Sequence, residues 1–176
     1  MYADNTLTPK EAARLCALGT LATSDAMSYA ALAASVRHFI DRVQGPSLNV
    51  LGSSLELLKY EGLVRTAGDG PDATLTLTAD GRDELHMLLT ANLRPGATDL
   101  NKLIVASKFR FLHLLAAEDQ RTQVELMLDT VETELARLTD LRAHHAGEPG
   151  HLIAWMDREI AELTARADWL RDFEAI

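Results

Sequence analysis

Apolar side chains recur at helical spacing in the first sixty residues, which predicts three helices. The run Thr8-Pro9-Lys10-Glu11 combines a capping box with a proline at the first helical position, so a helix should begin there. Ser28 should cap a second helix that ends at Gly45-Pro46, and Ser47 a third that Gly62 stops. The apolar positions expected to face inward are Ala12, Leu15, Cys16, Ala22, Leu32, Val36, Phe39, Ile40, Leu48, Leu51, Leu55 and Leu58.

The pattern changes from helical to alternating just after this third helix. We expect short strands at Leu63–Thr66 and Thr74–Thr78, since the second alternates Thr and Leu as a half-buried strand does. The turn between them is Gly68-Asp69-Gly70-Pro71-Asp72, and a fourth helix should follow over Ala79–Asn92. A helix followed by a β-hairpin wing is the order found in a winged helix-turn-helix, whose recognition helix enters the major groove of DNA.

The second half of the chain predicts only helices. A linker at Arg94–Thr98 precedes helices at about Asp99–Ala117, Asp119–His145 and Gly150–Glu174. The expected fold is therefore mainly α with a small β-hairpin wing. Residues 1–93 should form the winged helix-turn-helix domain and residues 94–176 a helical dimerisation and effector region.

The last two helices carry apolar residues at alternating spacings of three and four, which is the pattern of a coiled-coil seam. The seam positions expected in a dimer interface are Val124, Leu128, Val131, Leu135, Ile153, Ile160, Leu163 and Leu170. Two such helices carry more apolar surface than one hairpin needs, so we predict a homodimer joined through them. In the alternative, both seams close on each other within one hairpin.

Composition narrows the class of protein. No apolar run approaches the roughly 18–20 residues that cross a bilayer, and the first residues do not resemble a secretory signal. Cys16 is the only cysteine, which excludes an internal disulfide and a cysteine zinc cluster. We therefore expect a cytoplasmic, soluble protein without a membrane partner.

The net charge of −9 bears directly on nucleic-acid binding. Through Asn92 there are 7 Lys and Arg against 11 Asp and Glu, and after it 10 against 15, so acidity is spread along the chain. DNA binding must then depend on a few local groups, for which the candidates are Arg37, Ser47, Asn49, Ser53, Ser54, Lys59, Arg65 and Arg82. Asn reads adenine and Ser donates to bases or phosphates. Ser47 as a simple helix cap and Lys59 as a solvated residue are the competing interpretations.

Several segments together resemble the PadR family of transcriptional regulators over nearly the whole chain. These are Ser28-Tyr29, Ser47, Leu57-Leu58-Lys59-Tyr60-Glu61-Gly62-Leu63-Val64, Leu77-Thr78-Ala79-Asp80-Gly81-Arg82, Lys108-Phe109-Arg110-Phe111-Leu112-His113-Leu114-Leu115 and Trp169-Leu170. The resemblance implies a homodimeric, sequence-specific regulator, expected to be a repressor, that binds an inverted repeat in double-stranded DNA. It also implies a small-molecule effector acting on the helical region.

The chain departs from the family's pattern where the family contacts DNA. Gly52 stands where members carry a tyrosine, Glu56 where they carry a cationic residue or histidine, and Asp69 and Asp72 occupy a wing that is usually basic. Carboxylates aimed at phosphates would repel them. These departures favour a second hypothesis, in which the winged domain no longer binds DNA and acts on a partner protein.

Other chemistry has little support in the sequence. His144, His145 and His151 surround a turn without helical pairing, so a solvated turn is favoured over a metal site. No nucleophile–base pair or phosphate-binding loop is present, so neither catalysis nor a cofactor is expected. Trp155 and Trp169 are expected to pack on the helical seam, with a ligand pocket as the alternative.

Overall fold

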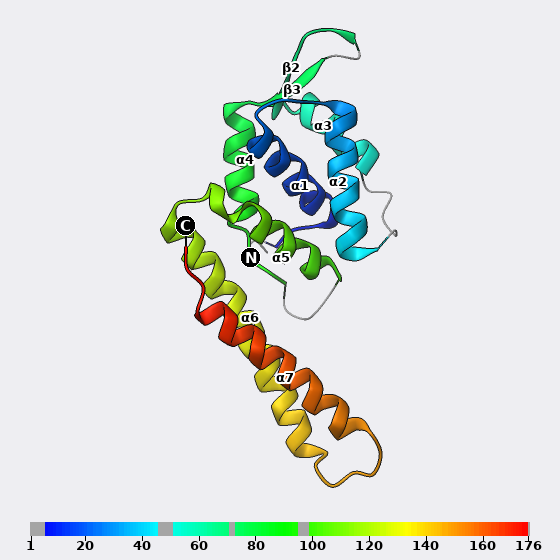
Figure 1. Ribbon diagram of the computed structural model, residues 1–176, viewed down its shortest axis with the longest axis vertical. Coiled ribbons are helices and arrows are strands. Elements are labelled where there is room, and N and C mark those ends of the chain that lie inside the picture. The colour runs from blue at the N-terminus through cyan, green and yellow to red at the C-terminus, as the bar shows by residue number, and fades with distance from the viewer. Residues whose placement is uncertain (1–5, 46–50, 71–72, 95–98, 176) are drawn as a thin grey trace, which may run out of the picture. The chain divides into compact units, whose positions relative to one another are not determined.

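The structure, a computed structural model, describes residues 6–45, 51–70, 73–94 and 99–175, and the side chains of 51–54 lie outside the description. Helices dominate the described residues (Figure 1). The elements are α1 (Pro9–Ser24), β1 (Met27–Ser28), α2 (Tyr29–Gln44), α3 (Leu51–Tyr60), β2 (Val64–Ala67), β3 (Thr74–Leu77), α4 (Ala79–Leu89), α5 (Asp99–Phe111), the 3₁₀ turn η2 (Leu112–Leu114), α6 (Ala117–His144) and α7 (Leu152–Arg171). The predicted mainly helical fold with a small β-hairpin wing is confirmed.

Helix α1 is the centre of the first compact unit, which spans Met1–Leu115. It begins at the predicted capping box: the Thr8 backbone N donates to Glu11 Oε2 at 2.7 Å, and Glu11 N donates to Thr8 Oγ1 at 3.3 Å. From Leu15 to Leu21 every residue of α1 is buried, as expected for a helix surrounded by others. Helices α2, α3, α4 and α5 all contact it.

A three-stranded antiparallel sheet of order β1-β3-β2 forms the wing and its base. In the hairpin, Val64 pairs with Leu77 and Ala67 with Thr74. Leu75 and Leu77, two positions apart on β3, are both buried and therefore face the core. Strand β1 pairs with β3 through Met27 and Leu75 and was not predicted, because two residues are too short to show alternation. The hairpin projects beyond the helices at one end of the unit (Figure 1).

Helix α5 belongs to the first unit, although the sequence placed it beyond the expected boundary at residue 93. It contacts α1 and α2 and buries Leu103, Ile104 and Phe111. Helix α5 ends at Phe111 and is followed directly by η2. Leu115 then has an extended backbone, and α6 begins at Ala117. That residues 1–93 alone bind DNA stays a prediction.

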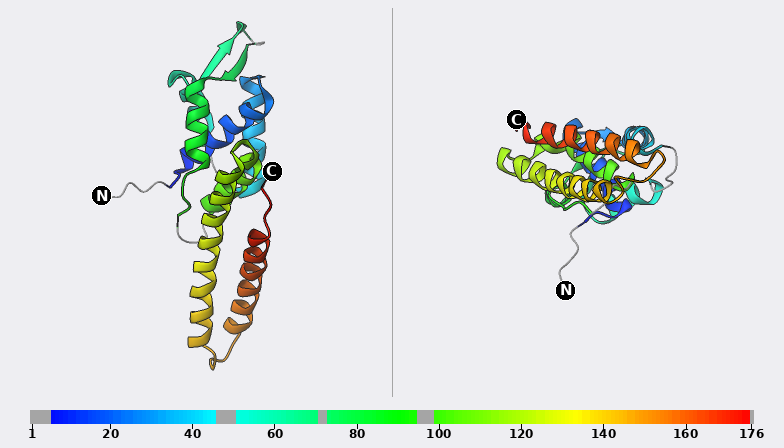
Figure 2. Two further views of the ribbon diagram at one scale, coloured as in Figure 1. Left: turned by 90° about the vertical axis from the view of Figure 1, so that its left-hand side faces the viewer. Right: turned by 90° about the horizontal axis from the view of Figure 1, so that it is seen from below.

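The second unit, Ala116–Ile176, is an antiparallel hairpin of α6 and α7 (Figure 2). Two ion pairs connect the helices. Arg142 pairs with Asp157 near the turn, and Arg171 Nη2 lies 2.7 Å from Glu132 Oε1 farther from it. Helix α7 begins at Leu152 rather than Gly150, since Gly150 has a φ of +110° that a right-handed helix excludes. No helix in the described part of the chain is long and apolar enough to cross a membrane.

Candidate nucleic-acid interface

Helix α3 presents its outward face to solvent because Leu55 and Leu58 hold the opposite face in the core. The described side chains on the outward side are Glu56, Leu57, Lys59 and Tyr60, and all four are exposed. Leu57 is 40% and Tyr60 89% exposed. Neither Leu57 nor Tyr60 was among the predicted site residues, although their spacing of three, out of phase with Leu55 and Leu58, places them on this face.

The predicted DNA-binding residues fall into two groups. Ser47 and Asn49, and the side chains of Ser53 and Ser54, lie outside the described residues. The four cations are described and exposed: Arg37 on α2, Lys59 on α3, Arg65 on β2 and Arg82 on α4. Within the described part of the chain none of them forms an ion pair, whereas Arg137, Arg142, Arg158 and Arg171 of the second unit all do.

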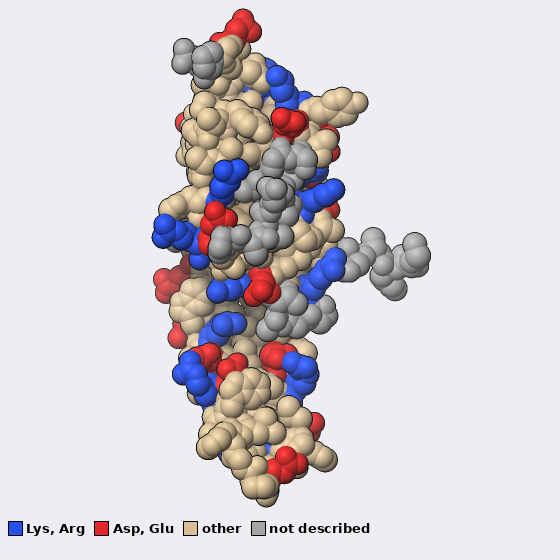
Figure 3. Space-filling model, turned by 90° about the vertical axis from the view of Figure 1, so that its right-hand side faces the viewer, with Lys and Arg blue, Asp and Glu red and all other residues tan. Residues whose placement is uncertain are grey.

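The side of the chain on which α2 lies carries no broad basic surface (Figure 3). Figure 3 shows the side on which α2 lies in Figure 1, and there Lys and Arg are separated by uncharged surface and by Asp and Glu. In the wing Arg65 alternates with the buried Val64, while Asp69 is exposed near the tip. A DNA contact on this side would therefore use isolated positive groups rather than a continuous positive field.

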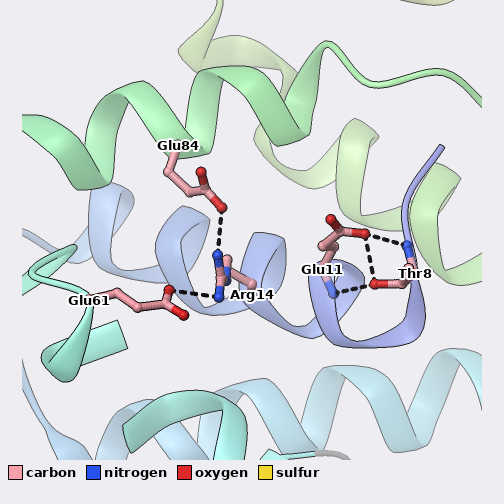
Figure 4. Close-up of polar contacts among 5 residues, drawn as sticks. All are labelled: Thr8, Glu11, Arg14, Glu61 and Glu84. Carbon is pink, nitrogen blue, oxygen red and sulfur yellow. Dashed lines mark hydrogen bonds and ion pairs between the residues drawn. The ribbon is translucent and has the colours of Figure 1, made fainter. Parts of the chain in front are cut away.

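Arg14 anchors the end of α3 to the rest of the unit (Figure 4). From α1, its Nη2 lies 2.7 Å from Glu61 Oε2, one residue beyond α3, and its Nη1 lies 2.7 Å from Glu84 Oε1 of α4. Burial alone would lower the pKa of Arg14, but the hydrogen bond and charge of Glu84 and the charge of Glu61 outweigh it and raise the pKa. One guanidinium thus connects the end of α3 to α4, the helix that follows the wing.

We expect Arg14→Gln to lower the free energy of unfolding by about 1–2 kcal/mol, because it removes two partly buried charged contacts and leaves two carboxylates facing each other. Chemical denaturation followed by circular dichroism measures this. Arg166→Gln is the matched control, since Arg166 is exposed on α7. Equal stability of the two variants would show that Arg14 does not fix α3.

The wing is attached to α4 through its backbone. Thr78 N donates to Leu63 O at 3.1 Å, and Thr78 Oγ1 donates to Gly62 O at 2.8 Å. Thr78 Oγ1 also accepts from Gly81 N at 3.0 Å as the cap of α4. A Cβ on Gly81 would lie 2.0 Å from Leu63 O, so only glycine permits this close approach. The Leu-Thr-x-x-Gly segment noted in the sequence is therefore the joint between wing and helix.

Lys108 is a structural cation of the first unit. Its side chain is buried, and Nζ donates to Leu89 O at 2.7 Å and Ala91 O at 2.5 Å, two carbonyls at the end of α4. Burial lowers the pKa of Lys108 to about 8. Nearby, Cys16 Sγ lies 3.1 Å from Ser107 Oγ, and burial raises the pKa of the Cys16 thiol to about 11. Position 108 thus closes the end of α4 rather than facing a ligand.

These two groups predict opposite pH dependences of stability. The unfolded chain keeps the Lys108 proton up to about pH 10.5 and the folded chain releases it near 8, so Lys108 makes stability rise with pH across that window. The unfolded chain loses the Cys16 proton near 9 and the folded chain near 11, so Cys16 makes stability fall across that window. Each full change is on the order of 3 kcal/mol.

Denaturation at several pH values should show these slopes separately. In the wild type, the free energy of unfolding rises from pH 8 to 9. Above pH 9 the rise due to Lys108 and the fall due to Cys16 offset each other. In Lys108→Met only the fall above pH 9 remains, and in Cys16→Ala the rise continues toward 10.5. Identical pH profiles for Lys108→Met and the wild type would contradict a pKa of about 8 for Lys108 in the folded chain.

Some of the predicted dimer-interface residues are buried within the hairpin of a single chain. Val124, Val131 and Leu170 are buried within the single chain, and a role for them in a dimer interface stays a prediction. The other five are half-buried: Leu128, Leu135, Ile153, Ile160 and Leu163. Helices α6 and α7 contact each other along the hairpin, so part of both seams is closed within one chain. An interface role for those five positions stays a prediction.

Trp155 and Trp169 lie outside the core, at 51% and 55% exposed, so the expectation that both are seam residues is wrong. They are fourteen residues apart on α7, close to four turns, and therefore share a side of the helix with Leu152. We call Leu152, Trp155 and Trp169 the tryptophan stripe. Charged residues, among them Glu162 and Arg166, lie between the two tryptophans along α7, so the stripe consists of separate exposed aromatic side chains on one side of the helix.

The histidines near the turn of the hairpin form local contacts. His145 Nδ1 lies 2.7 Å from Glu148 Oε1, and the rings of His144 and His145 meet edge to face at 4.9 Å between centroids. Among the residues that the structure describes, no three His, Cys, Asp or Glu side chains gather as metal ligands would.

Comparison with known proteins identifies the family of this chain. Residues 2–174 match the profile of the family described as "Putative AphA-like transcriptional regulator". No protein of curated function matches the sequence. The chain is similar to solved structures of Bacillus subtilis PadR with p-coumaric acid (14% identity, 94% of this chain and 95% of that chain, TM-score 0.38) and with operator DNA (17%, 90% and 93%, 0.38). It is also similar to the PadR-like regulator BC1756 from Bacillus cereus (16%, 90% and 93%, 0.37). At these TM-scores no residue role is carried over.

Proposed function

The chain belongs to the family of AphA-like transcriptional regulators, and from that premise we propose that it is a homodimeric, sequence-specific DNA-binding repressor of the cytoplasm. Helix α3 enters the major groove of double-stranded DNA, and the flanking cations hold phosphates. Two copies read the two halves of an inverted repeat. A small-molecule effector changes the separation of the two winged domains.

One observation carries this proposal: the four exposed cations of α2, α3, β2 and α4, which are Arg37, Lys59, Arg65 and Arg82, have no acidic partner in the described part of the chain. A cation held without an ion pair is available to a phosphate, and it gains a charge-assisted hydrogen bond on binding. They lie on four different elements, α2, α3, β2 and α4, from which side chains can hold phosphates while α3 contacts the bases.

Titration of the protein against a panel of genomic fragments, with increasing salt, tests this function. Because few cations are present, we expect a log–log salt slope of only about −3 to −5. Arg65→Gln should weaken binding to all fragments alike and make the slope shallower by about one for each copy bound. Arg166→Gln, on an exposed position of α7, should change neither. Equal weak affinity for every fragment would contradict a sequence-specific reader.

The homodimer is proposed to form through the tryptophan stripe together with the half-buried seam positions. Exposed aromatic side chains are the usual anchors of protein interfaces. Trp155→Glu should convert a dimer to monomers, measured by sedimentation, because it places a charge in an apolar contact. Met87→Glu is the control, since Met87 is equally exposed on α4. A wild-type chain that is monomeric in dilute solution would overturn the dimer.

A second candidate function is supported by the exposure of Asp69 in the wing and of Leu57 and Tyr60 on α3. In it, the winged domain acts on a partner protein with a basic surface and does not bind DNA. Asp69→Lys separates the two. A DNA reader should gain affinity for every fragment, whereas a complex built on acidic surface should weaken. The readouts are DNA titration and pull-down in the absence of nucleic acid.

A further inference from the structure

The outward face of α3 has an unusual composition for a helix that meets DNA. Glu56, Leu57 and Tyr60 are exposed together, opposite the buried Leu55 and Leu58. Side chains three or four positions apart on a helix are neighbours, so Tyr60 borders both Glu56 and Leu57. Lys59 is the only cation among the described side chains of α3, and it lies toward the end of the helix.

The Glu56 side chain stabilises no contact among the residues that the structure describes. Within the described residues it forms no ion pair or hydrogen bond through its side chain, whereas Glu61 and Glu84 both pair with Arg14. A carboxylate only accepts hydrogen bonds. In the major groove the amino group of cytosine N4 is a donor that a Glu can bind, and the thymine methyl is an apolar group that an aliphatic side chain can contact.

We propose that Glu56 reads a cytosine through its N4 amino group and that Leu57 contacts a neighbouring thymine methyl, so that α3 selects pyrimidines on one strand of each half-site. This inference rests on the proposed DNA-binding function. The chain has few cations there, so it recognises DNA with a carboxylate acceptor and an apolar contact instead of the more common arginine–guanine pair. Tyr60, one turn beyond Glu56, is placed to donate its hydroxyl to a phosphate beside these bases.

The charge of Glu56 gives it a role in rejecting other sequences. Near phosphates a carboxylate is repelled, so its presence lowers affinity for any DNA in which it lacks a donor. A base with an amino donor compensates this repulsion, and cytosine does so best because adenine places its N7 acceptor beside the N6 amino group. Discrimination thus comes from a penalty on the wrong base as much as from a contact with the right one.

Selection of binding sites from random duplexes, with wild-type protein and Glu56→Gln, tests the first contact. Gln pairs with the N6 and N7 groups of adenine, so the variant should exchange a cytosine for an adenine at one position of each half-site, with about a tenfold change in preference. Exposed Glu and Gln have similar helix propensities, so the variant should fold. Glu125→Gln, exposed on α6, is the matched control and should select the wild-type sequence.

Uracil in place of thymine tests the second contact, since uracil lacks only the methyl group. Uracil at each thymine of the selected half-site should lower wild-type affinity several-fold at one position, while Leu57→Ala should bind both duplexes equally. A wild-type chain that is indifferent to uracil at every position would overturn the contact assigned to Leu57.

The outcomes separate this inference from the function on which it rests. Enrichment of a sequence that Glu56→Gln leaves unchanged overturns the reading by Glu56 and preserves DNA binding. Failure of the wild type to enrich any sequence overturns both, and favours the protein-binding function. Enrichment of a sequence whose cytosine is exchanged in Glu56→Gln but not in Glu125→Gln establishes Glu56 as a reader of bases.

Discussion

Replacing Gly81 by alanine should lower the free energy of unfolding of the first unit by about 3 kcal/mol or more. The new methyl group would lie 2.0 Å from Leu63 O, a backbone atom that cannot rotate away. To relieve this contact, α4 must move from the start of β2, which breaks the hydrogen bonds from Thr78 to Leu63 and Gly62. The wing would then lose its fixed position beside α3, and DNA affinity should fall with stability.

The sign of this effect is informative because helix propensity predicts the opposite. Alanine inside a helix is favoured over glycine by about 1 kcal/mol, so a Gly81→Ala protein without the close contact would be more stable than the wild type. Gly147→Ala is the matched control, since a Cβ there meets nothing within 4 Å. Thermal unfolding of both variants decides between the two. A melting temperature of Gly81→Ala equal to or above that of Gly147→Ala would refute the close contact.

Substitutions at Gly19 and Phe111, which contact each other, should have the second large effect on the free energy of unfolding. The ring of Phe111, which ends α5, covers Gly19 in the middle of α1, and a Cβ on Gly19 would lie 2.5 Å from Phe111 Cδ2. Phe111→Ala should cost about 3–5 kcal/mol through loss of burial and a cavity. Gly19→Ala should cost about 1–3 kcal/mol by overpacking.

The double variant tests whether these two residues meet. In Gly19→Ala with Phe111→Ala, the new methyl enters the space vacated by the ring, so the double change should cost less than the sum of the single changes by about 1 kcal/mol or more. Phe111→Ala combined with Gly147→Ala is the control and should be additive. If the costs in free energy of unfolding were additive in both double variants, Gly19 and Phe111 would not be in contact. Helix α5 would then not pack on α1, as the predicted domain boundary at residue 93 implies.

Local signals in the sequence were sufficient for most of the first unit. The capping box at Thr8, the caps at Ser28 and Thr78 and the Thr–Leu alternation of β3 each depend on neighbours within a few residues. Such signals are readable without knowledge of the fold. The winged architecture and the membership in a family of transcriptional regulators are confirmed on this basis.

The features that the sequence did not reveal depend on contacts between distant residues. Strand β1 exists only because β3 offers it a partner about 47 residues later. The burial of Lys108 follows from two carbonyls at the end of α4, and no local pattern marks a lysine that enters the core. The division of the hairpin's apolar residues into a closed seam and an exposed tryptophan stripe depends on which faces of α6 and α7 meet.

The candidate site was predicted in part, for a related reason. Exposure of Arg37, Lys59, Arg65 and Arg82 follows from their polarity and was expected. Their lack of acidic partners among the described residues was not predictable, because Asp and Glu are common in the sequence and the fold alone decides which carboxylates reach Arg14 instead. Leu57 and Tyr60 were overlooked because exposed apolar residues are common on folded proteins.

Sequence-specific binding by a dimer is tested most directly by the stoichiometry and symmetry of one DNA complex. The chain should be titrated against its most strongly selected duplex, and the mass of the complex measured by sedimentation alongside a footprint of both strands. We expect two chains on one duplex and a footprint with two-fold symmetry, its halves about one or two helical turns apart. A single chain per duplex with an unrepeated footprint, or the same affinity for an unrelated duplex, would contradict a dimeric reader.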